Sequence, residues 1–316
     1  EFFYYVCQNL IIMKKLNILL FLILGIIIGY AQEKSISCGT NSVMEKLYRE
    51  NPSLKKQSEL FNQLLKDETK LSSFKRFNAK TNSTIYEVPV VVHIISDGGN
   101  VGSNYNRSEA QIIEWIKYTN EIFSTKGSGM KNESNGGAVI PIKFVLAKRD
   151  QNNKIFNGIN RYDASGNSNY KNNGMHPTKG VSESTILSWV PMWNTSKYYN
   201  IYVVKNLYSG NNDVAGYAWY PYSYYYGTFI HGEYGKEGKD TLAHEFGHSM
   251  NLIHTHGNGD GSTCDGDDYV DDTEPMKDVM GNDNWLGEPT CVSGKNPCTG
   301  KNWAGGQYNI MAYSNC

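Results

Sequence analysis

A short histidine-rich stretch, His244-Glu-Phe-Gly-His248-Ser-Met-Asn-Leu-Ile-His254, constrains the local fold of this chain more than any other feature. Residues four apart lie on one face of a helix, so His244 and His248 can reach one cation, with Glu245 beside it but not bound to it. His254 can reach the same cation only if the helix ends at once, which requires a left-handed backbone near Asn251. Asparagine tolerates that conformation second only to glycine. The spacing therefore predicts a helix, a sharp turn and three histidine ligands to one zinc ion.

Two interpretations of this stretch differ in their chemistry. An ordinary polar helix can carry three hydrogen-bonded histidines, and His-Glu-x-x-His alone recurs by chance. The third histidine favours zinc, because three neutral nitrogen ligands leave one position for a water molecule whose pKa falls to about 7 on the metal. Glu245 is placed to take a proton from that water as general base. The stretch therefore predicts zinc-dependent hydrolysis.

The composition indicates a folded chain without a bulk charge. Of the 316 residues, 40% are hydrophobic and 19% are charged, which suits one good-sized globular domain with appendages. Thirty basic residues stand against thirty-one acidic residues, so bulk charge favours neither nucleic acid nor a membrane surface as a partner. We expect protein or peptide substrates that are recognised by a site.

The N-terminal region has the pattern of a secretory signal peptide. Met13 and two lysines precede an apolar run that ends in Gly-Tyr-Ala31, which are the charged start, apolar centre and small-residue end of such a peptide. We expect residues 13–31 to be a signal peptide cleaved after Ala31 and residues 1–12 to be an upstream artefact. The processed protein is then secreted, without stable membrane association. A membrane anchor is the alternative, although the run is short for a span.

Residues 32–85 are predicted to form a helical pro-segment, because they are rich in lysine, carry scattered apolar residues and lack strand signals. Cys38 lies in Ser-Cys-Gly-Thr, and a thiolate is a strong zinc ligand that can take the position needed by water. Cys38 is therefore a candidate zinc ligand in a zymogen. The alternative is an unpaired or intermolecular thiol. Lys75-Arg76 and Lys80 are candidate activation sites.

Strand and helix patterns alternate between this segment and the zinc stretch. Residues 86–95 form a β-branched run that is typical of a buried strand. Residues 109–123 follow Ser108 as a capping residue, repeat apolar positions at helical spacing and should pack across a sheet. Further strands are expected at 142–147, 199–204, 214–220 and 227–230. This order predicts an α+β fold with a twisted sheet.

The zinc stretch resembles the long signature of the metzincin metallopeptidases, whose second hallmark is a methionine-containing turn beneath the metal. The sequence Tyr308-Asn-Ile-Met311-Ala-Tyr313 matches that turn. Among metzincins, the chain is most similar to the pappalysin family, which includes ulilysin-like and cytophagalysin-like secreted bacterial enzymes. Further matches to this family are Ser37-Cys38-Gly39-Thr40, Gly158-Ile159 and Val270-Asp-Asp272-Thr273.

The resemblance implies a metzincin fold in residues 86–316, with a twisted mixed sheet, a backing helix and an active-site helix. The upper part is expected at 86–254, and a loop-rich lower part tied by disulfides at 255–316. Met311 then forms the hydrophobic floor beneath the zinc, and Tyr313 approaches the metal and stabilises the oxyanion of the transition state. Related domains continue with a further helix, so a truncated C-terminus is expected.

An acidic loop follows the third histidine. Residues 257–290 contain ten acidic side chains and one lysine, and carboxylate-rich turns suit calcium. The resemblance implies a ligand set for a structural calcium ion: Asp268, Val270, Asp272 and Thr273. The alternative is a merely solvated acidic loop.

Four cysteines lie near the C-terminal end, and export would place them in an oxidising compartment where disulfides persist. Four cysteines allow three pairings. The resemblance favours Cys264 with Cys298 and Cys291 with Cys316.

Together these features predict a secreted zinc-dependent endopeptidase made as a zymogen, with Glu245 as general base. A substrate should lie extended along the strand at 214–220 and add a strand to the sheet edge. The rival among enzymes is a zinc peptidase whose third ligand is a downstream glutamate, against which His254 and Met311 argue. The rival from another class is a secreted binding module with a structural zinc and no hydrolytic activity, against which the intact Glu245 argues.

Overall fold

The structure, a computed structural model, describes residues 37–66, 85–125, 137–209, 212–223, 227–257, 262–271, 273–277 and 294–312. All of them belong to one compact unit, Ile36–Asp283 together with Pro289–Cys316. Its elements in chain order are β1 (Ser37–Cys38), α2 (Thr40–Glu50), α3 (Pro52–Lys66), β2 (Tyr86–Ser96), α5 (Glu109–Phe123), β3 (Ile142–Leu146), β4 (Ile159–Asp163), α6 (Ser168–Asn173), α7 (Glu183–Trp189), β5 (Tyr199–Val204), β6 (Tyr208–Ser209), β7 (Asn212–Ala218), β8 (Gly227–His231), α8 (Thr241–Ser249) and the 3-10 helix η2 (Gly306–Tyr308).

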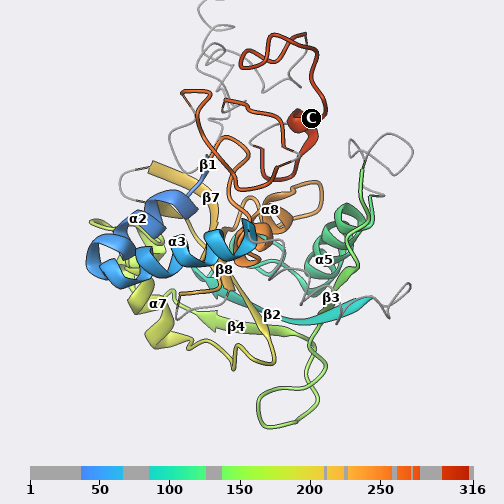
Figure 1. Cartoon of the computed structure of the whole chain (residues 1–316). Coiled ribbons are helices and arrows are strands. Elements are labelled where there is room, and N and C mark those ends of the chain that lie inside the picture. Colours follow the sequence, from blue (N-terminus) through green and yellow to red (C-terminus); the bar gives the residue numbers. More distant parts are fainter. Residues whose placement is uncertain are drawn as a thin grey trace, which may run out of the picture. The chain divides into compact units, whose positions relative to one another are not determined.

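A mixed sheet organises this unit (Figure 1). The strand order is β1-β7-β8-β5-β2-β3, with β4 also paired to β2 and β6 also paired to β7. The pairings of β7 with β8 and with β6 are antiparallel, and the other pairings between described strands are parallel. A mixed sheet flanked by helices is the predicted fold class, which is therefore confirmed.

Strand β2 forms the centre of the sheet because its β-branched sequence suits burial on both faces. Its residues 90–95 are fully buried. One edge of β2 pairs with β5, and the other edge pairs with β3 along its first half and with β4 along its second half. Gly158 directly precedes β4 and lies against the end of β3. It has a φ of +83°, and an added Cβ would lie 2.6 Å from Leu146 Cβ, so only glycine fits at this position.

Helix α5 packs on one face of the sheet. It begins with a capping box, in which Ser108 Oγ accepts a hydrogen bond from Gln111 N at 3.3 Å and the Gln111 side chain accepts one from Ser108 N at 2.8 Å. Ile112 and Trp115 are fully buried in a core that Phe246 of α8 also enters. The predicted helix and its cap are confirmed, and α5 and α8 lie on the same face of the sheet.

The sequence predicts no element between the strands expected at 142–147 and 199–204, where the structure has β4, α6 and α7. Helices α6 and α7 have six and seven residues, too few for an apolar period to be recognised. Tyr170 and Ile186 from these helices enter the core on the second face of the sheet. Strand β4 carries polar residues and depends on its pairing with β2.

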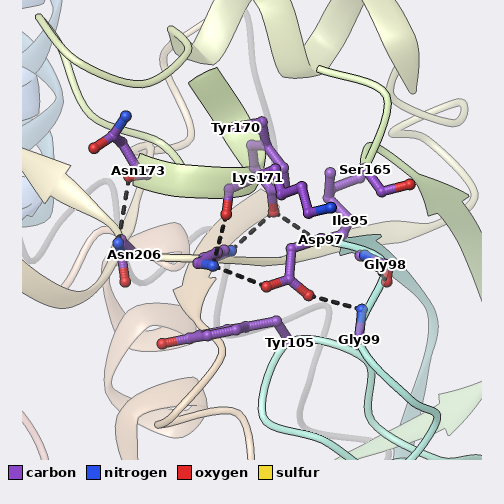
Figure 2. A network of polar contacts seen from close by, with 12 residues as sticks. Ile95, Asp97, Gly98, Gly99, Tyr105, Ser165, Tyr170, Lys171, Asn173 and Asn206 are labelled. Atoms are coloured by element: carbon purple, nitrogen blue, oxygen red, sulfur yellow. Dashed lines mark hydrogen bonds and ion pairs between the residues drawn. The ribbon is translucent and has the colours of Figure 1, made fainter. Parts of the chain in front are cut away.

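A polar network closes the carboxyl ends of β2 and β5 (Figure 2). Lys205 Nζ lies 2.9 Å from Asp97 Oδ2 and also donates to a backbone carbonyl of α6 at 2.7 Å. Tyr170 OH donates to Ile95 O at 2.6 Å and accepts from Lys205 N at 2.8 Å. Burial opposes ionisation of Asp97, but hydrogen bonds from Lys205 and a backbone amide keep its pKa below the ordinary value. The network ties α6 to the ends of two central strands.

The N-terminal elements β1, α2 and α3 are part of the same compact unit. Strand β1 pairs in parallel with β7, which places Cys38 opposite Gly216. Met44 of α2 shares a small core with Tyr220 and Ile253. The helical prediction for this region is confirmed, but β1 was not expected, because a strand of two residues exists only through its pairing partner.

Several predicted features lie outside the described residues. They are the segments 1–12 and 13–31, the candidate activation sites at Lys75, Arg76 and Lys80, and the residues Asp272, Cys291, Tyr313 and Cys316. Within the described ranges, no helix has the length and apolar run that a membrane crossing requires.

Candidate active site

Helix α8 carries the first two histidines and ends immediately after the second. The helix covers Thr241–Ser249. Asn251 follows with a φ of 70°, in the left-handed region. The turn at this residue brings His254 back to the face of α8 that carries His244 and His248, as the spacing requires.

The three imidazoles converge through their Nε2 atoms. His254 Nε2 lies 3.3 Å from His244 Nε2 and 3.1 Å from His248 Nε2. Two nitrogen ligands that are each bound about 2.05 Å from a tetrahedral zinc ion lie about 3.3 Å from one another. Both distances from His254 Nε2 therefore match the edge of a zinc coordination tetrahedron.

Backbone carbonyls orient two of these rings. His244 Nδ1 lies 2.7 Å from Ile310 O, and His248 Nδ1 lies 2.8 Å from Leu252 O. Because a carbonyl only accepts, each Nδ1 carries the proton and each Nε2 presents a lone pair to the centre of the cluster. Burial lowers the pKa of His244, and lowers the pKa values of His248 and His254 far below the ordinary value. The rings are thus neutral, which is the form that binds metal.

A turn from the C-terminal region forms the floor of the cluster. Ile310 supplies the carbonyl to His244, and the next residue, Met311, is buried. A Cβ on Gly247 would collide with Met311 Sδ, so a glycine at this position of α8 lets the turn approach the helix. Met311 thus lies where the resemblance implies.

Glu245 lies beside the cluster and is fully buried. Its Oε2 accepts a hydrogen bond from Thr40 Oγ1 at 3.0 Å, whereas its Oε1 has no hydrogen-bond partner among the described residues. Burial raises the pKa of Glu245 to about 8, although hydrogen bonds from Cys38 and Thr40 lower it. Gly216 of β7 leaves room for this side chain, because an added Cβ would lie 2.9 Å from Glu245 Cγ. A carboxyl group in this position can hold and release a proton near neutral pH.

Cys38 brings a fourth donor to the same point. Its Sγ lies 3.3 Å from His248 Nε2 and 3.5 Å from Glu245 Oε2. The sulfur and one nitrogen from each of the three clustered histidines lie within 4.8 Å of one another. Burial and the neighbouring Glu245 carboxylate raise the pKa of this thiol well above its ordinary value. The thiolate form therefore needs a cation beside it.

Among the other buried histidines, His256 and His93 have different surroundings from the cluster. His256 stacks on His254 with ring centroids 5.0 Å apart and does not belong to the convergent group. His93 in β2 lies between two amides, with Nε2 3.0 Å from Asn200 Oδ1 and Nδ1 3.0 Å from Asn160 Nδ2. Burial lowers the pKa of His93 to about 4. His93 is a neutral, hydrogen-bonded residue of the sheet.

The lower part of the chain contains a disulfide between Cys264 and Cys298, with an S–S distance of 2.14 Å. This is one of the two pairings that the resemblance favours. Because Cys291 and Cys316 lie outside the described residues, the other pairing stays a prediction.

Hydrogen bonds link the three described residues of the set expected to bind calcium, Asp268, Val270 and Thr273, to one another. Asp268 Oδ1 accepts from Val270 N at 3.0 Å, and Thr273 N donates to Val270 O at 3.1 Å. Burial raises the pKa of Asp268. Because Asp272 is not among the described residues, calcium at this turn also stays a prediction.

Sequence patterns do not reveal several groups that shape the site. The carbonyls of Leu252 and Ile310 belong to the backbone, which carries no residue-type signal. Thr40 Oγ1 accepts from Ala218 N at 3.0 Å and donates to Glu245, so it links the N-terminal segment to both β7 and the carboxylate. Its only sequence signal is its place in Ser-Cys-Gly-Thr.

Comparisons with known proteins agree with this geometry. The family model described as Pregnancy-associated plasma protein-A (Peptidase_M43) matches residues 180–316. No curated protein sequence matches the chain significantly.

Solved structures match over more of the chain. The chain is similar to Tannerella forsythia mature mirolysin in complex with a cleaved peptide, with 28% identity, a TM-score of 0.55 and coverage of 73% of this chain and 84% of that one. It is similar to a mutant of Tannerella forsythia promirolysin, with 26% identity, a TM-score of 0.61 and coverage of 88% and 86%. A complex of mirolysin with compound 9 matches with 26% identity, a TM-score of 0.53 and coverage of 73% and 84%.

The region matched by the family model includes both α8 and the turn that carries Met311. The distances from His254 Nε2 to the other two histidine nitrogens of that region suit zinc, and a structural match extends the similarity to 88% of the chain. Over residues 180–316 the chain therefore matches the pappalysin family of metzincin zinc metalloendopeptidases, and its fold is similar to that of mirolysin.

Proposed function

We propose that this chain is a secreted zymogen whose active form cleaves protein or peptide substrates with Glu245 as general base. The observation that carries the proposal is the convergence of the Cys38 thiol and three imidazoles beside that carboxylate. The comparisons support it, because the match to a promirolysin covers 88% of the chain and the match to a mature mirolysin covers 73%. This difference is expected of a chain that carries a pro-segment.

In the active form, the Nε2 atoms of His244, His248 and His254 would hold the zinc ion. When bound, zinc lowers the pKa of a water molecule and polarises the peptide carbonyl. Glu245 then accepts a proton from the water and delivers it to the leaving amine. We assign stabilisation of the transition-state oxyanion to Tyr313, on the strength of the family resemblance.

We propose that substrate binds along the edge of β7 that β1 occupies in this structure. In the structure, residues 37–40 use this edge: Gly39 N donates to Gly216 O at 2.7 Å, and Ala218 N donates to Thr40 Oγ1 at 3.0 Å. An extended peptide can pair with the same backbone groups. Because a solved structure similar to this chain holds a cleaved peptide, a peptide at this edge is the binding mode we expect. Latency then comes from competition for the strand edge as well as from the thiol.

Replacement of Glu245 tests the assigned base. Glu245→Ala should keep about one zinc per chain, since the carboxylate is not a ligand. It should lose casein hydrolysis by at least about a hundredfold, which is the lower range for general base catalysis. A Glu245→Ala enzyme with full activity would refute the assignment. Wild-type enzyme treated with a metal chelator is the control, and a folded zinc protein that never digests casein would instead support the rival binding module.

Replacement of Cys38 tests latency separately. Cys38→Ala should shorten the lag before activity appears, because the thiol no longer blocks the metal site. Lys46→Ala is a matched control in α2, since Lys46 is exposed and its ion pair with Glu50 is at the surface. An unchanged lag in Cys38→Ala would count against the switch.

The remaining parts of the proposal concern processing and calcium. We propose that residues 13–31 are a signal peptide, 32–85 a pro-segment and 86–316 the catalytic domain, and N-terminal sequencing of the secreted and active forms tests these limits. We further propose that the turn at 268–273 binds a structural calcium ion. A calcium-selective chelator should then lower the melting temperature of the zinc-loaded enzyme, and an unchanged melting temperature would refute it.

A further inference from the structure

Three segments of the lower part of the chain meet at one carboxylate, that of Glu274. Its Oε1 accepts hydrogen bonds from Ala304 N at 2.8 Å and from Gly306 N at 2.9 Å. Its Oε2 accepts one from Asn296 Nδ2 at 2.7 Å. Glu274 follows the turn proposed for calcium, but none of these contacts involves that turn.

Burial and further hydrogen bonds hold the Asn296 side chain in the orientation in which its Nδ2 donates to Glu274. Asn296 is fully buried, its Nδ2 also donates to Pro275 O at 2.9 Å, and its Oδ1 accepts from Cys298 N at 2.8 Å. Cys298 is in turn fixed by the disulfide to Cys264. The Glu274 carboxylate therefore has a donor on each oxygen and joins a disulfide-tied segment to the segment that begins at Ala304.

The segment whose backbone amides bind Glu274 continues to the carbonyl that orients His244. Gly306 is the first residue of η2, and the carboxylate satisfies an amide at the N-terminus of this short helix. The end of η2 is followed at once by Asn309, whose Oδ1 accepts from Met311 N at 2.9 Å. The residue between them, Ile310, supplies the carbonyl that accepts from His244 Nδ1 at 2.7 Å.

Close packing accompanies the hydrogen bonds. An added Cβ at Gly306 would lie 3.1 Å from Glu274 Cγ and 3.1 Å from Met276 Sδ, so η2 lies directly against this segment. Met276 is fully buried. Ile310 packs against the core beneath α5 and α8, so a shift of η2 would move a residue that is part of the active-site floor.

Resting on the zinc site proposed above, we infer that Glu274 is a positioning residue for that site. Its carboxylate anchors η2, η2 sets the place of the Ile310 carbonyl, and this carbonyl fixes the ring orientation of His244. Loss of groups that orient a metal-bound histidine from outside the ligand set typically lowers metal affinity by about 10- to 100-fold. Glu274 acts through His244 and touches neither substrate nor the reacting atoms.

The test compares zinc release from variants of the full chain. Glu274→Ala removes all three hydrogen bonds, whereas Glu274→Gln keeps an oxygen for Ala304 N and Gly306 N and loses the acceptor for Asn296. Asp265→Ala is the matched control, because Asp265 is an exposed acidic residue of the same region. Zinc transfer to a chromogenic chelator gives the release rate, and the visible absorption of the cobalt-substituted protein reports ligand geometry.

The expected order of release rates is Glu274→Ala, then Glu274→Gln, then the Asp265→Ala control and wild type together. We expect Glu274→Ala to release zinc about 10- to 100-fold faster than wild type, with a changed cobalt spectrum. Glu274→Gln should be less than about tenfold faster, since one hydrogen bond is lost. Metal-free Glu274→Ala should keep the circular dichroism of metal-free wild type, because the two cores of the sheet do not include Glu274.

Release from folded Glu274→Ala at the control rate, with an unchanged cobalt spectrum, would overturn the inference. If Glu274→Ala does not fold, Glu274→Gln decides: faster release than the control supports the inference, and an equal rate overturns it. His254→Ala distinguishes a failure of the zinc site itself. If wild type binds no more zinc than His254→Ala, the proposed function is wrong, whereas a difference between these two leaves the Glu274 comparison as the deciding result.

Discussion

Replacement of Asn251 by glycine separates two tasks that one residue performs. The left-handed φ of 70° lets the chain turn back towards the histidine cluster. The side chain does something else, because its Nδ2 donates to Asn62 Oδ1 of α3 at 3.1 Å. Both residues are 8% exposed. Asn251→Gly keeps the turn, since glycine adopts positive φ freely, and removes only the contact with α3.

The expected magnitude follows from this burial. A buried hydrogen-bonding group that loses its partner costs about 1–3 kcal/mol. Because 1.4 kcal/mol corresponds to tenfold, docking of the N-terminal helices should weaken by about 5- to 150-fold. The active form, which we propose lacks residues 32–85, has no such contact to lose. Its activity should therefore change by less than about twofold.

The accessibility of Cys38 measures the docking. Labelling of this thiol by a cysteine reagent, located by peptide mass spectrometry, requires the N-terminal segment to open. We expect Asn251→Gly to label about 5- to 150-fold faster than wild type in a Glu245→Gln background that prevents self-cleavage. Asn62→Ala should give a similar increase, and the double variant should not exceed either single variant by much, because both changes remove the same hydrogen bond.

Two results would refute this reasoning. A labelling rate of Asn251→Gly within about twofold of wild type would show that the hydrogen bond does not hold the segment, since the expected lower limit is about fivefold. A large loss of activity in the active form would show that the asparagine side chain, rather than only the left-handed turn, is needed at the zinc site.

Three further changes test the sheet and the site. His93→Gln should remove a pH dependence: burial lowers the His93 pKa from 6.5 to about 4, so wild type should lose about 3 kcal/mol of unfolding free energy as pH falls from 6.5 to 4. Urea unfolding at both pH values checks this, and an equal loss in the variant would contradict it. Lys205→Met leaves the largely enclosed Asp97 without its partner and should reduce the unfolding free energy by about 3 kcal/mol. Adding Asp97→Asn should restore part of this loss. A loss below about 1 kcal/mol would show that the Lys205–Asp97 pair contributes no more than a solvent-exposed ion pair. Gly216→Ala would place a Cβ 2.9 Å from Glu245 Cγ. The displaced carboxylate should lower kcat/KM of the active form by about tenfold or more at normal zinc content. Unchanged kinetics would show that contact with residue 216 does not determine the position of Glu245.

Much of the upper fold could be predicted because its signals are local. The β-branched run of β2, the cap and apolar period of α5, and the histidine spacing of α8 each lie within one short segment. Strand β4 and the helices α6 and α7 escaped prediction because they are short and polar. They exist because β2 offers an edge for pairing and because the second face of the sheet must be covered.

The zinc chemistry could be predicted from the amino-acid sequence alone, because the period of a helix and the tolerance of Asn251 for positive φ depend only on residue type and spacing. Contacts between distant segments had to come from the folded chain. Cys38 reaches His248 across 210 positions, the Ile310 carbonyl orients His244 across 66 positions, and Glu274 binds Gly306 across 32 positions. The reason is physical: a backbone carbonyl or amide is the same in every residue, so its partner is set by how the sheet and loops bring the chain together.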